Sequence, residues 1–494
     1  MNEELFDHFE ALTFDDVLVV PGWSEVLPAE VQTTTVLGGI ELRTPLISAA
    51  MDTVTEAPLA ISLAREGGVG VLHRNLSIED QADQVDRVKR AQSGMIDRPI
   101  SLHPGATLAD AEELMGRNKI SGVPICDPDG RLVGILTNRD VRFCGEGEFD
   151  RKVSDFMTSE GLVTAPVGTS LDEAKQLLHR HRIEKLPLVD EAGRLRGLIT
   201  VKDIMKRIQK PDATLDPRGR LRVGAAIGVT DVAQRAEALI GAEVDFLVID
   251  TAHGHTRGVI DAVAIIKKGW PEVPVIGGNV VTREGVDALV EAGADMVKVG
   301  VGAGSICTTR VVAGAGMPQM SAIFECARAA REHLVADGEG NARPVPIIAD
   351  GGVVSSGDIV KAFVAGADAV MVGNALAGVD EAPGDLELVD GAMWKTYRGM
   401  GSAGAMRGRA ADRYGTAQEA SGGAKHVAEG VEARVRYAGA LSELVSQLTG
   451  GLRSGMGYAG AATLDDLHHR TRLVRITGAG LRESHPHDVD VLRD

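Results

Sequence analysis

The segment 300–310, with the sequence Gly-Val-Gly-Ala-Gly-Ser-Ile-Cys-Thr-Thr-Arg, joins a cysteine to three alternating glycines. Glycines in this pattern let the backbone turn tightly and approach a ligand. Converging backbone N–H groups would favour the thiolate, which is the nucleophilic form of cysteine. We therefore predict that Cys307 is a catalytic nucleophile, although the local sequence also fits a small apolar residue in a turn.

The other three cysteines lie in different surroundings. Cys126 and Cys144 follow apolar residues, Cys326 lies in a helical pattern, and none has glycines on both sides. We expect all three to be structural. Four cysteines without paired spacing in 494 residues favour a reducing compartment over a disulfide scaffold.

Length and charge exclude several classes of protein. A chain of 494 residues predicts more than one domain. The formal charge of -18, without a cluster of lysine or arginine, argues against a nucleic-acid partner. The sequence contains no run of about 18 apolar residues, so no membrane span is predicted. Its acidic start has no apolar core typical of a signal peptide. We expect a cytoplasmic enzyme.

A short apolar run, a polar or glycine-rich turn and a helical pattern recur along the chain. The strand-like runs are 46–49, 68–73, 223–229, 246–253, 273–280, 296–304, 346–352 and 369–373. Eight buried parallel strands separated by helices predict an α/β fold of the (β/α)₈ type, with catalytic residues at the carboxyl ends of the strands. Segments 292–300 and 365–373 also resemble each other. The alternative is an open, doubly wound sheet.

A second repeat lies between the second and third strands. Segments 122–140 and 185–203 share a proline, two glycines, a threonine and an aspartate at an offset of 63 residues. Each predicts strand, turn, strand and helix, after an amphipathic helix at 108–118 or 171–180. The pair resembles a tandem CBS module, which binds adenine or guanine nucleotides. The resemblance implies that Asp140 and Asp203 hold ribose hydroxyls; the alternative is that they cap helices.

Three further strand ends carry groups suited to phosphate. Gly304-Ser305, Asp350-Gly-Gly352 and Gly373-Asn374 each follow a strand, and the last loops of such barrels often bind phosphate. Together with Cys307 they predict a phosphate ester attacked by a thiolate. The irregular segment 399–430 predicts a mobile flap, and 435–450 predicts a final helix.

Six motifs together resemble the inosine-5'-monophosphate (IMP) dehydrogenase/GMP reductase family. They are GAGSICTT at 302–309, SAAMDTVTE at 48–56, DTAHGH at 250–255, GNV at 278–280, YRGMGS at 397–402 and GLRSGMG at 451–457. The resemblance covers essentially the whole chain. It implies a TIM barrel with an inserted tandem CBS (Bateman) domain: barrel at 1–92, CBS pair at 93–209, and barrel with the flap at 210–494.

The resemblance also implies a reaction. The family's dehydrogenases oxidise IMP to xanthosine 5'-monophosphate (XMP) with NAD⁺, the committed step of guanine nucleotide synthesis. Cys307 would form a covalent thioimidate with the base. Arg413 and Tyr414 match the pair that activates water, with Thr309 and Glu429 as a second proton relay. An arginine base has a pKa above about 12, so its role rests on the resemblance alone.

Binding residues carry over by position. Substrate contacts would be Ser305, Asp350, Gly352, Gly373, Asn374, Tyr397, Gly399, Met400, Gly401 and Glu429. NAD⁺ contacts would be Asp250, Thr251, His253, Asn279, Gly300 and Gly302. K⁺ would be held by carbonyl groups of Gly302, Gly304 and Cys307, with Glu483, Ser484 and His485 of a neighbouring subunit. Zinc at His253 and His255 is disfavoured, since no further ligands of suitable spacing follow.

Partners and assembly are also implied by the family. We expect IMP as substrate, ATP or GTP/GDP at the CBS pair, and a homotetramer or octamer. Three features depart from the family pattern: Asn374 stands where serine is usual, Gly415 where phenylalanine is common, and the spacing from Arg413 to Glu429 is longer. These differences concern closure of the flap, whereas the first chemical step depends on Cys307.

Two other functions remain open from the sequence. GMP reductase, which converts GMP to IMP with NADPH, shares the barrel, the cysteine and the Thr-Glu relay, but generally lacks the Arg-Tyr pair. A nucleotide sensor would use the CBS pair and keep the barrel as a scaffold. Arg413-Tyr414 favours the dehydrogenase over the reductase, and Cys307, Thr309 and Glu429 favour an enzyme over a sensor.

Overall fold

The computed structural model describes residues 10–91, 96–97, 99–118, 120–336, 342–407 and 427–489. The chain divides into two compact units. One comprises Met1–Lys89, Asp212–Asp216 and Leu221–Asp494, and the other Arg90–Pro211 and Pro217–Arg220. Each unit is described by itself.

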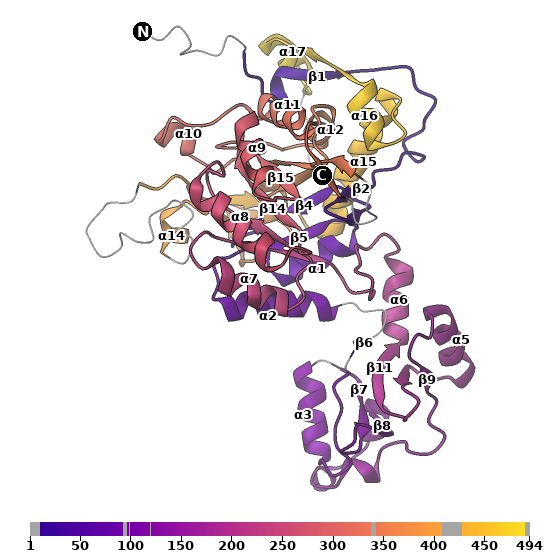
Figure 1. The fold of residues 1–494 in the computed structure, drawn as a ribbon. Coiled ribbons are helices and arrows are strands. Elements are labelled where there is room, and N and C mark those ends of the chain that lie inside the picture. The colour runs from indigo at the N-terminus through magenta and orange to yellow at the C-terminus, as the bar shows by residue number, and fades with distance from the viewer. Residues whose placement is uncertain are drawn as a thin grey trace. The chain divides into compact units, whose positions relative to one another are not determined.

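The first unit is built on a closed barrel of eight parallel strands (Figure 1). In chain order the strands are β4 (Leu46–Ser48), β5 (Val69–Leu72), β12 (Val223–Ile227), β13 (Phe246–Ile249), β14 (Val275–Val280), β15 (Met296–Val299), β18 (Ile347–Asp350) and β19 (Ala369–Val372). They are almost entirely buried, as parallel strands covered by helices must be. The predicted (β/α)₈ barrel is confirmed, and the open sheet is excluded because β5 pairs with β12 and β19 with β4.

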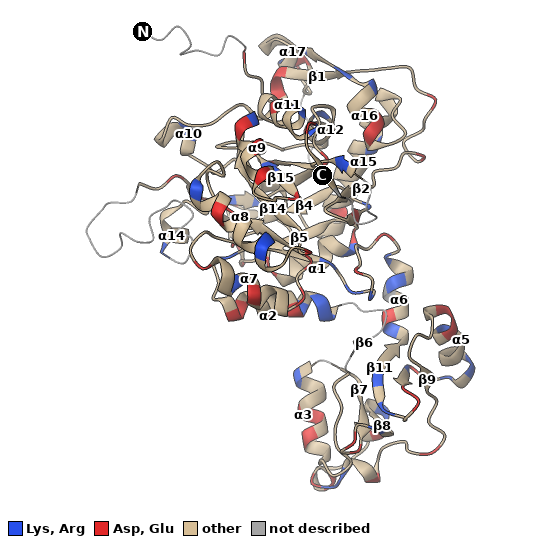
Figure 2. Cartoon of the chain, in the orientation of Figure 1, with Lys and Arg blue, Asp and Glu red and all other residues tan. Residues whose placement is uncertain are grey.

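Helices follow the strands and surround the barrel (Figure 1). They are α1 (Ala57–Arg65), α2 (Ile78–Ala91), α7 (Val232–Gly241), α8 (Arg257–Gly269), α9 (Arg283–Glu291), α10 (Thr309–Val312), α11 (Gln319–Ala330), α12 (Ser356–Val364) and α13 (Asn374–Ala377). Figure 2 shows charged residues of both signs along α2. The opposite face of α2 buries Val85 and Val88, so this helix has the amphipathic pattern of an outer layer.

A hairpin closes the amino-terminal end of the barrel. Its strands are β2 (Thr35–Leu37) and β3 (Ile40–Leu42), joined by Gly38 and Gly39 at positive φ. Leu37, Ile40 and Leu42 pack into the same buried cluster as the barrel's interior side chains. A filled interior leaves the carboxyl ends of the strands as the open end for a ligand.

Further elements lie outside the barrel strands. They are η1 (Phe14–Asp16), β1 (Val17–Val20), β16 (Leu334–Ala336), β17 (Ala342–Pro344), β20 (Leu386–Val389), β21 (Ala392–Arg398), α14 (Ala403–Met406), β22 (Glu432–Arg436), α15 (Leu441–Ala459), α16 (Leu464–Arg470), β23 (Arg472–Arg475) and α17 (Gly478–Glu483). β1 pairs with β23, β16 with β17, and β20, β21 and β22 form one antiparallel sheet.

The helix predicted over 435–450 was wrong at both ends. Val435 lies in β22, where burial alternates with a period of two, and α15 starts after Gly439, whose φ is 74°. The helix then continues beyond 450, because its glycines allow α12 to approach closely. A Cβ atom on Gly451 would lie 2.0 Å from Ser356 Oγ, and one on Gly455 would lie 2.5 Å from Val360 Cγ2.

The second unit contains the two copies of the 63-residue repeat. The first copy has α3 (Leu108–Asn118), β7 (Gly122–Cys126), β8 (Leu132–Thr137) and α4 (Asn138–Val141); the second has α5 (Leu171–His181), β10 (Lys185–Val189), β11 (Leu195–Thr200) and α6 (Val201–Gln209). Short elements β6 (Ile96–Asp97), η2 (Glu146–Glu148), η3 (Val153–Asp155) and β9 (Ala165–Pro166) complete it. Each copy has its own apolar cluster.

The two copies have the same order of elements, and the aspartates Asp140 and Asp203 make the same kind of contact in both. Asp140 Oδ2 accepts hydrogen bonds from the backbone N–H and the hydroxyl of Thr137, both at 2.7 Å. Asp203 Oδ2 accepts one from the Thr200 hydroxyl at 2.5 Å. Both aspartates therefore stabilise the start of a helix in this structure. A role in binding ribose stays a prediction.

None of the helices in the described ranges is long and apolar enough to cross a lipid bilayer.

Candidate active site

A cavity of about 140 Å³ lies at the carboxyl ends of the barrel strands. Loops after four strands, β4, β13, β15 and β18, line it, together with residues of β14, β15, β18, β19 and β21 and residues within 399–401 and 429–430. The lining residues are Ala49, Ala50, Met51, Asp250, Thr251, Ala252, Asn279, Lys298, Gly300, Gly302, Ala303, Gly304, Ile306, Cys307, Thr309, Asp350, Gly351, Met371, Tyr397, Gly399, Met400, Gly401, Glu429 and Gly430. This is the end at which TIM barrels carry their catalytic residues.

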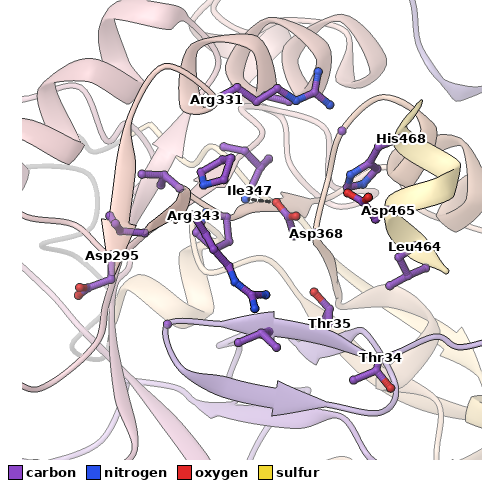
Figure 3. Close-up of a pocket in the computed structure, with 18 of the residues that line it drawn as sticks. Thr34, Thr35, Asp295, Arg331, Arg343, Ile347, Asp368, Leu464, Asp465 and His468 are labelled. Atoms are coloured by element: carbon purple, nitrogen blue, oxygen red, sulfur yellow. Dashed lines mark hydrogen bonds between the residues drawn. The ribbon is translucent and has the colours of Figure 1, made fainter. Parts of the chain in front are cut away.

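A larger cavity of about 360 Å³ lies near the opposite ends of the strands (Figure 3). Asp368, which precedes β19, accepts a 2.7 Å hydrogen bond there from the backbone N–H of Ile347. Burial raises the pKa of Asp368. Residues at the amino-terminal face of a TIM barrel generally support stability, and no predicted site residue lines this cavity. The smaller cavity is therefore the candidate site.

Cys307, Thr309 and Glu429 form a continuous line of hydrogen-bonding groups. Thr309 Oγ1 donates to Glu429 Oε2 at 2.8 Å and lies 3.2 Å from Cys307 Sγ. A hydroxyl has one proton to donate. Because Thr309 donates its proton to Glu429, the lone pairs of Thr309 Oγ1 are left to accept a hydrogen bond from the Cys307 thiol. The arrangement can pass a proton from Cys307 through Thr309 to Glu429.

Backbone pairing brings Glu429 to the cysteine loop. Thr308 N–H donates to the carbonyl of Glu429 at 3.0 Å, and Val431 N–H donates to the carbonyl of Ile306 at 3.0 Å. Cys307 and Gly430 therefore oppose each other as an isolated antiparallel bridge. Residues separated by more than one hundred positions in the sequence are thus held in register at the cavity.

Burial distinguishes Cys307 from two other cysteines. Burial raises the pKa of Cys326 to about 12 and raises that of Cys126 above its usual value. Both thiols stay protonated at neutral pH, and a protonated thiol is a poor nucleophile. Cys307 is partly exposed to the cavity, as a nucleophile must be.

Lys298 lies on the floor of the cavity and was missed from the sequence. Its side chain is only 2% exposed, and its ammonium contacts Asp350 Oδ2 at 2.6 Å and Asn279 Oδ1. Asp250 Oδ1 lies 3.8 Å away. Asn279 Nδ2 also donates to Asp350 Oδ2 at 2.9 Å. A lysine inside the apolar strand Met-Val-Lys-Val was the available signal, because an ammonium is buried only with partners.

Tyr397 forms one wall next to the glycine loops. Burial raises its pKa to about 12, although a hydrogen bond with Ser305 acts in the opposite direction. A Cβ atom on Gly373 would lie 3.3 Å from the Tyr397 hydroxyl, and one on Gly351 would lie 3.2 Å from the backbone nitrogen of Gly304. The three loops predicted to hold phosphate are therefore adjacent, and their glycines allow the close approach.

The structure brings most predicted site residues together. Those lining the cavity are Cys307, Thr309, Glu429, Asp350, Tyr397, Gly399, Met400, Gly401, Asp250, Thr251, Asn279, Gly300, Gly302 and Gly304. Ser305, Gly352, Gly373 and Asn374 are outside the lining but belong to the same loops. His253 is exposed and does not line the cavity.

The remaining predicted residues are not among those that line the cavity in the described part of the chain. Arg413 and Tyr414 lie outside the described residues, so their placement is not described. Glu483, Ser484 and His485 are exposed at the end of α17, which contacts η1. Within the described ranges, no group of three or more His, Cys, Asp or Glu side chains could hold a metal ion.

Comparisons with known proteins assign the family. The IMP dehydrogenase / GMP reductase domain matches residues 11–487. The chain is 55% identical over 487 residues to an inosine-5'-monophosphate dehydrogenase of Halalkalibacterium halodurans, covering 98% of this chain and 97% of the relative. It is 53% identical over 489 residues to the Bacillus subtilis protein of that name, with the same two coverages.

A solved structure matches the fold of the whole chain. The crystal structure of a GMP reductase variant from Trypanosoma brucei in complex with guanosine 5'-monophosphate is 42% identical and superposes with a TM-score of 0.88, covering 99% of this chain and 100% of that chain. Sequence and structure agree, and the chain belongs to the IMP dehydrogenase/GMP reductase family.

Proposed function

We propose that this protein oxidises IMP to XMP with NAD⁺ through a covalent intermediate on Cys307. The line of contacts from Cys307 through Thr309 to Glu429, at the open end of the barrel, is the observation that carries the proposal. The names of its relatives support the same reaction.

In the first step Cys307 Sγ bonds to C2 of the hypoxanthine ring, and the π electron pair of the C2=N3 double bond moves to N3. The thiol proton passes through the Thr309 hydroxyl to Glu429. The C2–H bond would then break as the electron pair on N3 restores the C2=N3 bond, and NAD⁺ held at this site would supply the acceptor for the hydride. What remains on Cys307 is a thioimidate.

In the second step water adds to C2, the C2–S bond breaks, and Cys307 recovers its proton. Arg413 and Tyr414 of the flap are proposed to activate that water, with Thr309 and Glu429 as a second route for its proton. The second route is supported by the 2.8 Å hydrogen bond between Thr309 and Glu429.

The nucleotide would be held by groups of different chemistry. The loops carrying Ser305, Gly352, Gly373 and Asn374 offer hydroxyl, amide and backbone N–H donors for phosphate, beside the neutral phenol of Tyr397. Asp350 would accept from the ribose hydroxyls. Gly399, Met400, Gly401 and Glu429 would surround the base.

Asp250, Thr251, His253, Asn279, Gly300 and Gly302 would hold NAD⁺. All except His253 line the cavity, which is consistent with a second ligand beside Cys307. K⁺ suits the carbonyl oxygens of Gly302, Gly304 and Cys307, because potassium binds neutral oxygen ligands. The carbonyl of Gly304 already accepts from Cys307 N–H at 3.1 Å but keeps a second lone pair. Glu483, Ser484 and His485 of a neighbouring subunit would complete that site.

Absorbance at 340 nm tests the activity. It rises with IMP and NAD⁺ for a dehydrogenase, falls with GMP and NADPH for a reductase, and stays constant for a nucleotide sensor. GMP reductase is the second candidate because the T. brucei structure superposes over the whole chain. Arg413-Tyr414 in the sequence favours the dehydrogenase.

We also propose that the repeat unit is a tandem CBS domain at about 93–209 that binds ATP or GTP/GDP. The matching order of elements in its two copies supports this assignment. Calorimetry with ATP and GTP tests it, and absence of binding would refute it. We further propose a cytoplasmic homotetramer or octamer, to be checked by mass measurement with and without nucleotide.

A further inference from the structure

We propose that Asp52 and Arg398 act together as positioning residues that hold two loops around the purine base. The proposal rests on the function proposed above and assigns a role to two side chains that do not line the cavity themselves. We call this ion pair the Asp52–Arg398 clamp.

The clamp has the geometry of a forked arginine–carboxylate pair. Arg398 Nη2 donates to Asp52 Oδ2 at 2.6 Å, while Nε lies 3.1 Å from Oδ1 and 3.2 Å from Oδ2. The Asp52 side chain is 7% exposed and that of Arg398 is 31% exposed. The hydrogen bond to Asp52 raises the pKa of Arg398. A second contact joins the same segments, since Arg398 N–H donates to Thr53 Oγ1 at 3.2 Å.

The clamp lies one residue away from the walls of the cavity. Met51 precedes Asp52, and Tyr397 and Gly399 flank Arg398; all three line the cavity. Met51 also packs against Met400 in a small apolar cluster. Two loops that are far apart in sequence are therefore joined by a charge pair, with a buried aspartate and a partly exposed arginine, beside an apolar contact.

Neighbouring groups restrain both sides of the clamp. Asn75 Nδ2 donates to Asp52 Oδ2 at 2.8 Å, and Asn75 N–H donates to His73 Nδ1 at 3.2 Å, so the loop after β5 supports the aspartate. Glu432 lies opposite Arg398 across β21 and β22, and its Oε1 accepts from Gly404 N–H at 2.8 Å. The clamp thus contacts the segments on both sides of the flap.

Arrangement and location distinguish positioning from simple stabilisation. A buried carboxylate is tolerated when it is paired with a cation. Pairing alone would therefore explain a contribution to stability, wherever in the chain the ion pair lies. Only a pair beside the cavity walls can change the affinity for a nucleotide while leaving Cys307 and its relay unchanged. Lysine could supply the charge of Arg398 but lacks the planar fork that contacts both carboxylate oxygens.

The test compares Asp52→Asn, Arg398→Met, Arg398→Lys and the Asp52→Asn/Arg398→Met double variant in the full-length enzyme. The matched control is Lys267→Met, which removes the Lys267–Asp295 pair (3.0 Å) away from the candidate site. Steady-state kinetics give the KM for IMP, the KM for NAD⁺ and kcat. Calorimetry gives IMP and GMP binding, and thermal unfolding reports folding.

We expect the clamp variants to raise the KM for IMP by about tenfold to a hundredfold, because a shift of 1 Å in positioning groups can cost about a hundredfold. The KM for NAD⁺ should stay within about twofold, Arg398→Lys should be intermediate, and the double variant should be no worse than either single variant. Lys267→Met should change only the unfolding temperature.

Two results would overturn the proposal. One is a KM for IMP that stays at the wild-type value while kcat or the folded fraction falls, as for a purely structural pair. The other is full additivity of the single variants. Failure of the proposed function is distinguishable, since wild-type protein would then lack IMP oxidation. In that case unchanged nucleotide binding by the folded variants, Arg398→Lys included, would refute the clamp separately.

Discussion

Replacing Thr309 with valine isolates the proton relay with little change of shape. The substitution exchanges the hydroxyl for a methyl group at a buried position. It removes a 2.8 Å hydrogen bond to the Glu429 carboxylate, which is worth about 1.5–3 kcal/mol for a charged partner. It also removes the atom 3.2 Å from Cys307 Sγ. General acid–base catalysis contributes about 10²–10⁴-fold, so hydride transfer should slow by that range.

Stopped-flow absorbance at 340 nm after mixing with IMP and NAD⁺ measures this step, and iodoacetamide labelling of Cys307 measures thiol reactivity separately. Both rates should fall in Thr309→Val. Thr308→Val is the matched control, because it makes the same change of side chain at the neighbouring position. It keeps the Thr308 backbone N–H, which donates to the Glu429 carbonyl. Wild-type rates of the NADH burst and of labelling in Thr309→Val would refute the relay from Cys307 to Glu429.

Four further predictions test other parts of the site and fold. Cys307→Ala should abolish both hydride transfer and the covalent adduct, which mass spectrometry of quenched protein would detect on the wild-type tryptic peptide ending in Arg310; turnover by the variant would remove the assignment. An Arg413 variant should slow hydrolysis more than hydride transfer, so its NADH burst should survive; a slow first turnover would contradict that role. Cys326, whose pKa is raised to about 12, should resist iodoacetamide at pH 8 in the folded protein and react after unfolding, whereas equal labelling with Cys307 would show that its burial is transient. Asp368 has a raised pKa, so above the unfolded value of about 3.9 the folded state binds more protons and stability falls as pH rises. Asp368→Asn keeps an acceptor for Ile347 N–H and should flatten that fall in denaturant titrations between pH 4 and 7; an unchanged slope would assign it to other groups.

Much of the architecture was predictable because its signals are local. Apolar runs followed by turns marked the eight barrel strands, and the offset of 63 residues marked the two copies in the second unit. The glycine loop singled out Cys307 for the same reason. These patterns depend on neighbouring residues, whose backbone preferences and periodicity are readable in one dimension.

Features that depend on contacts between residues far apart in sequence were harder to predict from the sequence. The helix was predicted to end at 450, but α15 continues to Ala459 because Gly451 and Gly455 face α12. Lys298 was not predicted as a site residue because it lies inside an apolar strand. Its partners Asn279 and Asp350 come from two other strands. In each case the decisive neighbour belongs to another element.

The sequence by itself determined the barrel strands and the repeat, and it led to the prediction that Cys307 is the nucleophile. Only the tertiary structure decided that Glu429 reaches Thr309 and that Arg398 reaches Asp52. The physical reason is that a hydrogen bond or ion pair forms over about 3 Å, whereas these partners are far apart in sequence. Closure of the barrel and the pairing of β21 with β22 set those distances.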